Sequence, residues 1–342
     1  MPVSPELRNQ VMQQAQGMLA LQVAFVGVAN DLFLALHDHG PATPAALAAA
    51  TGLDAGYLER WCDVAYATGY LDDTADGFVL TELGDAFRSD LPDSLWPVAL
   101  GPVMGGHMAD RAASCMRDGQ QPGEAVLSER PVLAEFFGPM LETRFGGLFR
   151  AQILDALPLF ADVDARAGLV VDLGCGNGWY LRALAERFPR LRGLGLDGMP
   201  QNIDGARALA GAAGMDDRLA FRLGDLHGLA VDEPVSVFVM NRALHHVWDG
   251  RRALMEVMVS RLTPGGSVVI WEPRWPDERA ALRAPGLRPM AWQNLAEHVQ
   301  GNRFLRPAEI EAEYRAVGLE PRTLLFAGGN EAVVVGTLGA GL

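Results

Sequence analysis

Hydrophobic and polar positions divide the chain into a helical N-terminal third and a C-terminal part in which short apolar runs alternate with helical stretches. In the N-terminal third, the pattern predicts three helices and then a hairpin-like pair of strands, at residues 29–37, 45–50, 56–68, 70–72 and 78–81. In the C-terminal part, mainly apolar runs predict buried strands at residues 168–173, 191–196, 235–240 and 267–271. This alternation predicts an α/β fold with a mostly parallel sheet.

A glycine-rich turn follows the first of these strands. Residues 168–178 have the sequence Gly-Leu-Val-Val-Asp-Leu-Gly-Cys-Gly-Asn-Gly and run directly into a helix predicted at 179–188. Because Gly174, Gly176 and Gly178 carry no Cβ, such a turn can bring backbone N–H groups close to a nucleotide-like ligand. A dinucleotide site would have its acidic residue only after the second strand, whereas Asp172 precedes the first glycine here. A carboxylate at this position suits a sulfonium amino acid better than a pyrophosphate.

Four motifs in order resemble those of the class I S-adenosylmethionine (SAM) methyltransferases: V-V-D-L-G-C-G-N-G, G-L-G-L-D, R-L-G-D (222–225) and L-T-P-G-G (262–266). The resemblance covers residues 130–340 and implies a seven-stranded, Rossmann-like sheet with SAM as cofactor. It implies that Asp172 and the backbone of Gly174 and Gly176 bind the methionine end, and that Asp197 binds the ribose hydroxyls. Asp225 would then meet the adenine amino group. Gly224 and Asn241 complete the cofactor-binding set that we expect.

Composition limits the possible partners. The chain has 342 residues, enough for two domains, and its 49% hydrophobic content can fill a sizeable core. No apolar run is long enough for a membrane span, no signal peptide is indicated, and three cysteines without CxxC spacing fit a reducing compartment. We therefore expect a soluble, cytoplasmic protein without a membrane partner. The net charge of −14 opposes general binding to nucleic acid.

The order of elements in the N-terminal third is that of a winged helix-turn-helix, a fold that often reads DNA. However, Arg8, Arg60 and Arg88 are the only basic residues of segment 1–98, so we expect no binding to nucleic acid. Residues 7–36 are more apolar than one amphipathic stripe requires, which favours a homodimer, with a helix buried in its own chain as the alternative. Several small-molecule O- and C-methyltransferases that this sequence resembles dimerise in this way.

We expect three parts in the chain. Residues 1–98 would form a winged-helix dimerisation domain and residues 161–342 the SAM-binding domain. Between them, residues 99–160 would form a helical linker or lid, broken at 105–106, 118–123 and 138–139, whose breaks permit helices to reorient.

The segment Asn241–Asp249 follows an apolar strand, so its side chains emerge at the carboxyl edge of the sheet, where open α/β folds bind their ligands. In the O-methyltransferases that this chain resembles, a His at the place of His245 is the general base, and a carboxylate at the place of Glu272 orients it. The further carboxylate of that family would fall near 303–304, where this sequence has none.

Two further histidines suggest a second chemistry. His245, His246 and His298 could converge on an iron-, zinc- or other divalent metal ion, with open positions for substrate. This arrangement resembles the metal-dependent β-C-methyltransferases of α-keto acids, in which Arg144 would match an arginine that grips the substrate carboxylate. A metal of this kind stabilises an enolate as a Lewis acid.

We therefore predict a SAM-dependent methyltransferase of a small molecule, with metal-assisted C-methylation of a 2-oxo acid ahead of O-methylation by His245. A SAM-sensing regulator that binds DNA through the winged helix is the alternative from another class. The acidity of segment 1–98 opposes it.

Overall fold

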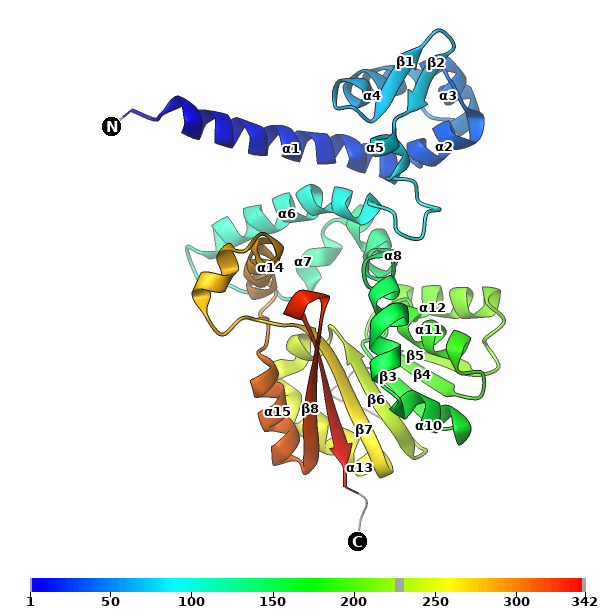
Figure 1. Ribbon diagram of the computed structural model, residues 1–342, viewed down its shortest axis with the longest axis vertical. Coiled ribbons are helices and arrows are strands. Elements are labelled where there is room, and N and C mark those ends of the chain that lie inside the picture. Colours follow the sequence, from blue (N-terminus) through cyan, green and yellow to red (C-terminus); the bar gives the residue numbers. More distant parts are fainter. Residues whose placement is uncertain (1, 225–230, 340–342) are drawn as a thin grey trace. The chain divides into compact units, whose positions relative to one another are not determined.

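The computed structural model describes residues 2–224 and 231–339, which form two compact units, Met1–Ala113 and Ser114–Leu342 (Figure 1). The first unit contains, in chain order, α1 (Pro5–Ala29), α2 (Leu32–His39), α3 (Pro44–Thr51), α4 (Ala55–Ala67), β1 (Leu71–Thr74), β2 (Gly77–Leu80), α5 (Glu82–Asp85) and most of α6 (Trp96–Cys115). The boundary between the units lies near the end of α6. The division into three parts that the sequence suggests stays a prediction.

The elements predicted for the first unit are confirmed. Thr43 caps α3, because its Oγ1 accepts a hydrogen bond from the N–H of Ala46 at 3.2 Å. Strands β1 and β2 pair antiparallel, with Leu71 opposite Leu80. The indole N–H of Trp61 in α4 donates to the carbonyl of Val23 at 3.2 Å, so α4 fixes the C-terminal part of α1.

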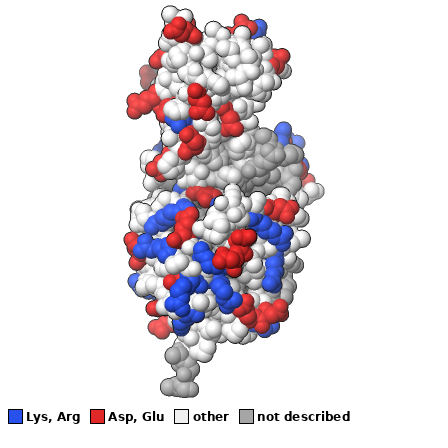
Figure 2. Space-filling view, turned by 90° about the vertical axis from the view of Figure 1, so that its right-hand side faces the viewer, with Lys and Arg blue, Asp and Glu red and all other residues white. Residues whose placement is uncertain are grey.

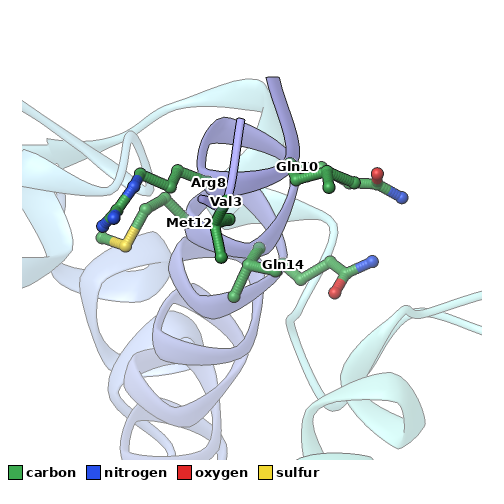
Figure 3. Close-up of a pocket in the computed structure, with 7 residues that line it drawn as sticks. Val3, Arg8, Gln10, Met12 and Gln14 are labelled. Atoms are coloured by element: carbon green, nitrogen blue, oxygen red, sulfur yellow. The ribbon is translucent and has the colours of Figure 1, made fainter. Parts of the chain in front are cut away.

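Large apolar side chains are exposed along α1: Val3, just before the helix, and Leu7, Val11, Met12, Met18, Leu19 and Val26 within it. Among the described residues, α1 alone is long and apolar enough to cross a membrane, with a mean hydropathy of 1.2 over its most apolar window. A hollow beside its first turns is lined only by residues between Val3 and Gln14, without a histidine, cysteine or carboxylate (Figure 3). We assign no chemistry to this hollow.

Charge is distributed unevenly over the surface. On the face that Figure 2 shows, the basic side chains gather on the second unit, whereas the first unit presents mainly acidic and uncharged side chains. This distribution agrees with the three arginines of segment 1–98. A surface of this sign repels a phosphate backbone.

The second unit contains helices and one seven-stranded sheet. Over the described residues its helices are α7 (Ala125–Ser128), α8 (Pro131–Leu148), the π-helix η1 (Phe149–Ile153), α9 (Leu154–Ala156), α10 (Leu159–Ala165), α11 (Trp179–Arg187), α12 (Pro200–Ala212), α13 (Arg251–Arg261), α14 (Arg288–Val299), α15 (Pro307–Ala316) and the 3₁₀ turns η3 (Leu244–Gly250), η4 (Arg279–Arg283), η5 (Pro285–Leu287) and η6 (Ala327–Gly329). Its strands are β3 (Leu169–Leu173), β4 (Arg192–Asp197), β5 (Leu219–Leu223), β6 (Val235–Asn241), β7 (Leu262–Pro273), β8 (Leu319–Phe326) and β9 (Glu331–Leu338).

The strand order is β5-β4-β3-β6-β7-β9-β8, with β9 antiparallel to both of its neighbours and the other pairs parallel. The predicted Rossmann-like sheet is therefore confirmed. The chain winds outward in opposite directions from β3 and β6, so the crevice at their carboxyl ends is the ligand position expected of such a sheet.

Two apolar cores lie on opposite faces of this sheet. One contains residues of α8 to α12, and the other contains residues of α13 and α15. Alternate residues of β3 serve the two cores, since Val170 belongs to the first and Val171 to the second. Helices on both faces leave the carboxyl edge of the sheet for binding.

Two of the three helix breaks predicted for residues 99–160 are wrong. Helix α6 continues through Gly105-Gly106, and α8 continues through Gly138-Pro139. A glycine within a helix costs only about 1 kcal/mol relative to alanine, which a packed helix can tolerate. The break at 118–123 is present, with Gly119 and Gly123 at positive φ.

Candidate functional site

The glycine-rich turn begins at the carboxyl end of β3. Gly174, Gly176 and Gly178 have φ values of 76°, 52° and 74°, a region that favours glycine. The N–H groups of Gly174 and Cys175 donate to the carbonyl of Leu196 in β4, at 2.8 and 3.0 Å. A Cβ placed on Gly176 would meet no described atom within 4 Å, so this part of the turn is open. A ligand can therefore approach its backbone.

Two buried carboxylates lie beside this turn. Asp172 in β3 is 1% exposed, and its Oδ1 has no hydrogen-bond partner among the described residues. Burial, together with the charge of Asp197, raises the pKa of Asp172 to about 8. Asp197 ends β4 and accepts hydrogen bonds from the N–H groups of Gly176 and Met199, both at 2.9 Å. An unpartnered buried carboxylate next to an open turn fits a positively charged ligand, as SAM is.

The other predicted cofactor residues lie at neighbouring strand ends. Gly224 follows β5, and its N–H donates to the carbonyl of Asp197 at 3.0 Å. Asn241 ends β6, and its Oδ1 is buried without a described partner. Asp225, expected to meet the adenine, lies outside the described residues. The described members of the predicted set thus lie at the carboxyl ends of four adjacent strands, β5, β4, β3 and β6.

His245 in η3 and Glu272 in β7 are both buried and in contact. The backbone N–H of His245 donates to Glu272 Oε1 at 3.2 Å, and Nδ1 of the ring lies 2.7 Å from Oε2. The carboxylate therefore fixes the orientation of the imidazole and leaves Nε2 on the opposite side. Nε2 is buried without a hydrogen-bond partner among the described residues.

The side of Nε2 faces a second carboxylate. Oε2 of Glu297 in α14 lies 3.7 Å from Nε2, and Glu297 is 7% exposed. Burial lowers the pKa of His245, but the two carboxylates, Glu272 above all, outweigh it and raise the pKa to about 10. The sequence places no carboxylate near 303–304, and Glu297 supplies one from another element. In the sequence, Glu297 is marked only by its position next to the candidate ligand His298.

His246 and Glu297, but not His298, are grouped with His245. Possible ligand atoms of His245, His246 and Glu297 all lie within 4.8 Å of one another. His298 is exposed, and its ring Nδ1 lies 3.2 Å from Nε2 of Gln121. The prediction that His298 converges with His245 and His246 is therefore corrected. Successive helical residues are rotated by about 100°, so only one of Glu297 and His298 faces inward.

His246 is also bound from outside this group. Its Nδ1 lies 2.8 Å from Oε1 of Glu124, just before α7, and 2.9 Å from Nδ2 of Asn302. The two imidazole rings lie 4.1 Å apart between centroids. The group thus combines two histidines with carboxylates on several sides.

The guanidinium groups of two arginines lie close to the ring of Phe145. Arg144 in α8 is exposed, with its Cζ 5.2 Å from the ring centroid of Phe145. Arg242 has a side chain that is 9% exposed and a φ of 56°. Its Cζ lies 3.9 Å from the same centroid, and its guanidinium pairs with Glu331 at 2.5 Å. The role of Arg144 as a carboxylate clamp stays a prediction. Sequence reasoning missed Arg242 and Glu331, because no pattern joins residues so far apart in the chain.

Comparison with known proteins agrees with this architecture. Residues 170–266 match the family described as "Methyltransferase domain". A trans-aconitate 2-methyltransferase of Streptomyces coelicolor is 32% identical over 143 residues, which are 42% of this chain and 47% of that protein. The mitomycin biosynthesis 6-O-methyltransferase of Streptomyces lavendulae is 28% identical over 261 residues, 71% of this chain and 70% of that protein. The chain spans less than two thirds of the length of the first of these.

Solved structures are similar over the whole chain. An O-methyltransferase family protein from Burkholderia thailandensis has a TM-score of 0.74 at 19% identity, with 100% of both chains covered. Human N-acetylserotonin methyltransferase in complex with SAM has a TM-score of 0.73 at 21% identity, with 99% of this chain and 100% of that chain covered. At these identities the likeness shows the fold. Residues 170–266 thus match a methyltransferase domain, and the chain shares the fold of these solved structures.

Proposed function

We propose that the protein is a SAM-dependent O-methyltransferase that acts on a phenolic hydroxyl of a small molecule, with His245 as general base. One observation carries the proposal: a buried imidazole is fixed through Nδ1 by Glu272, while its Nε2 makes no hydrogen bond among the described residues and lies 3.7 Å from Glu297. This is the geometry that a base needs to receive a proton from a bound hydroxyl. The similarity to a mitomycin 6-O-methyltransferase also supports O-methylation, and so ranks it above C-methylation.

The residues at the strand ends fit SAM. Asp172 has an unused buried oxygen for a positively charged group, the open Gly176 admits close approach, and Asp197 lies where ribose hydroxyls are expected. When bound, SAM supplies a methyl group attached to a positively charged sulfur. The contribution of the chain is to bind this group, exclude water and align the hydroxyl with it.

The strength of the base indicates the kind of hydroxyl. A general base acts in its unprotonated form, so its pKa decides the pH range in which it works. Flanked by Glu272 and Glu297, His245 has a pKa of about 10. Phenols such as tyrosine have a pKa of about 10, whereas aliphatic alcohols are far weaker acids. The ring of His245 therefore becomes neutral, and able to accept a proton, over the same pH range in which a phenol begins to ionise, and the imidazolium that forms is stabilised by both carboxylates.

The proposal is tested with methyl-labelled SAM and a panel of small phenols. Transfer of label to the phenolic oxygen is expected. His245→Gln should lose at least about a hundredfold in rate, in line with loss of a general base, while binding of S-adenosylhomocysteine persists. Equal rates in the variant would show that His245 is not the base.

A second candidate function rests on the group of His245, His246 and Glu297. Two imidazoles and one carboxylate within 4.8 Å form a donor set suited to a transition metal. A metal there would serve C-methylation of a 2-oxo acid as a Lewis acid, with Glu297 in the place expected of His298. Metal analysis of untagged protein tests this candidate, since at least about one ion per chain is expected of such a site.

We also propose that the first unit mediates a homodimer without binding nucleic acid. The exposed apolar side chains of α1, among them Leu7, Val11 and Met18, support association with a second copy of the chain. The small number of basic residues opposes the DNA-binding regulator. Mass measurement in solution and titration with duplex DNA test both parts.

A further inference from the structure

We propose that Glu142 is a positioning residue that holds the tip of the glycine-rich turn in its SAM-binding conformation. This inference rests on one part of the proposed function, the binding of SAM. The first half of the turn is fixed by β4, through hydrogen bonds to Leu196 and Asp197. Asn177, at the tip, is bound instead by α8.

One carboxylate oxygen of Glu142 joins the tip to the helix that follows it. Nδ2 of Asn177 donates to Glu142 Oε2 at 3.2 Å, and Nη2 of Arg182 in α11 donates to the same oxygen at 2.7 Å. Nη1 of Arg182 donates to the backbone carbonyl of Asn177 at 2.6 Å. Asn177 and Arg182 are both 7% exposed, so these bonds are largely shielded from water. The three side chains thus close a ring of hydrogen bonds around the tip.

The backbone of α8 approaches the same tip. A Cβ placed on Gly138, one turn before Glu142, would lie 3.1 Å from the Cβ and 3.2 Å from the Cγ of Asn177. Contacts this close require the neighbour to move. Gly138 and Glu142 share one helix face because they are four residues apart. This face of α8 therefore sets the position of Asn177 by contact and by charge.

Helix α8 does not need Glu142 to stay in place. Phe145 and Phe149, at the end of α8 and the start of η1, are buried in the core, and the ring of Phe149 lies 5.7 Å from that of Trp179 between centroids. Removal of the Glu142 carboxylate should free the turn while the helix remains packed. A residue with a merely structural role would instead lower thermal stability and leave ligand affinity unchanged.

The test compares the full-length protein with Glu142→Ala and Glu142→Gln by calorimetry with S-adenosylhomocysteine, and measures melting without ligand. The dissociation constant should rise about five- to tenfold in Glu142→Ala and less in Glu142→Gln, whose amide oxygen still accepts. Glu186→Ala is the matched control, because Glu186 also pairs with an arginine, Arg150, at 3.2 Å but does not touch the turn. This control should bind like the wild type.

Gly138→Ala provides an independent variant, because its Cβ would displace Asn177 without removing a charge. It should weaken binding in the same direction. Wild-type affinity in Glu142→Ala and Gly138→Ala would overturn the proposal, as would a melting temperature that falls while the dissociation constant is unchanged. Absence of binding by the wild type would instead overturn the proposed function itself, and this inference with it.

Discussion

The ionisation of His245 is the property of the site that most directly links structure to chemistry. Its ring lies between two carboxylates, with Nδ1 2.7 Å from Glu272 and Nε2 3.7 Å from Glu297. Burial disfavours the charged ring, yet the carboxylates raise its pKa from 6.5 to about 10. We therefore expect metal-free protein at neutral pH to contain one histidine that is protonated and stays so well above pH 7.

Glu297→Gln is the informative change. Two unit charges at 3.7 Å interact by about 4 kcal/mol at an effective dielectric constant of about 20. Each step of one in pKa corresponds to about 1.4 kcal/mol, and the amide retains an oxygen, so the pKa of His245 should fall by about 1 to 3. Glu278→Gln is the control, because it removes an exposed carboxylate from the same unit.

Nuclear magnetic resonance of labelled imidazole rings measures this pKa without a substrate. The chain has seven histidines, and the signal of His245 is the one that His245→Gln removes. In chelator-treated wild type it should change near pH 10, and in Glu297→Gln at a lower pH, whereas Glu278→Gln should resemble the wild type. If all histidines of the wild type titrate near their ordinary pKa, or if the two curves coincide, the electrostatic argument is wrong.

Four further outcomes are expected. Since burial and Asp197 raise the pKa of Asp172 to about 8, affinity for SAM should increase as pH rises through 8, and calorimetry of Asp172→Asn should show no such dependence. Ionisation of Asp172 should also destabilise the free protein, because its folded pKa exceeds its unfolded one: the loss builds up as pH rises from 3.8 to about 8 and is fully present above pH 8, so Asp172→Asn should melt higher than the wild type at pH 8 and above. Asp197→Ala should weaken SAM binding by about 1–3 kcal/mol in calorimetry, since it removes a charged acceptor. Light scattering should give about twice the chain mass of 36.7 kDa, and a salt-sensitive complex with duplex DNA would contradict the dimer-only role of the first unit.

The parts of the fold that could be predicted from the sequence depend on local pattern. Strands β3, β4 and β6 are mainly apolar runs, and the turn after β3 is marked by its glycines. The contact of His245 with Glu272 also follows from topology, because β6 and β7 are parallel neighbours with Asn241 opposite Trp271. Residues just beyond that pair must meet at the same edge of the sheet.

The contacts of the site that could not be predicted depend on how a helix is rotated about its axis, or they join residues that are far apart in the sequence. Glu297 and His298 are adjacent in sequence, and only the rotation of α14 decides that Glu297 faces His245. Gly138 resembles a helix breaker in the sequence, yet its missing side chain permits α8 to approach Asn177. Arg242 adopts a positive φ while its guanidinium pairs with Glu331, 89 residues away.

General-base O-methylation and metal-assisted C-methylation use Nε2 of His245 in different ways: in the first it accepts a proton, and in the second it binds a metal ion. A proton and a metal ion compete for Nε2 of His245, because a ligating imidazole must be deprotonated. If His245, His246 and Glu297 form a metal site, addition of zinc to chelator-treated protein should lower the pH at which His245 loses its proton. Glu297→Gln and His246→Ala should then each weaken zinc binding by more than the roughly ten- to hundredfold that loss of a residue supporting a ligand typically costs, because each removes a ligand itself. If zinc leaves the titration of His245 unchanged, Nε2 is available only to a proton, and the general-base reaction is the one that this site can perform.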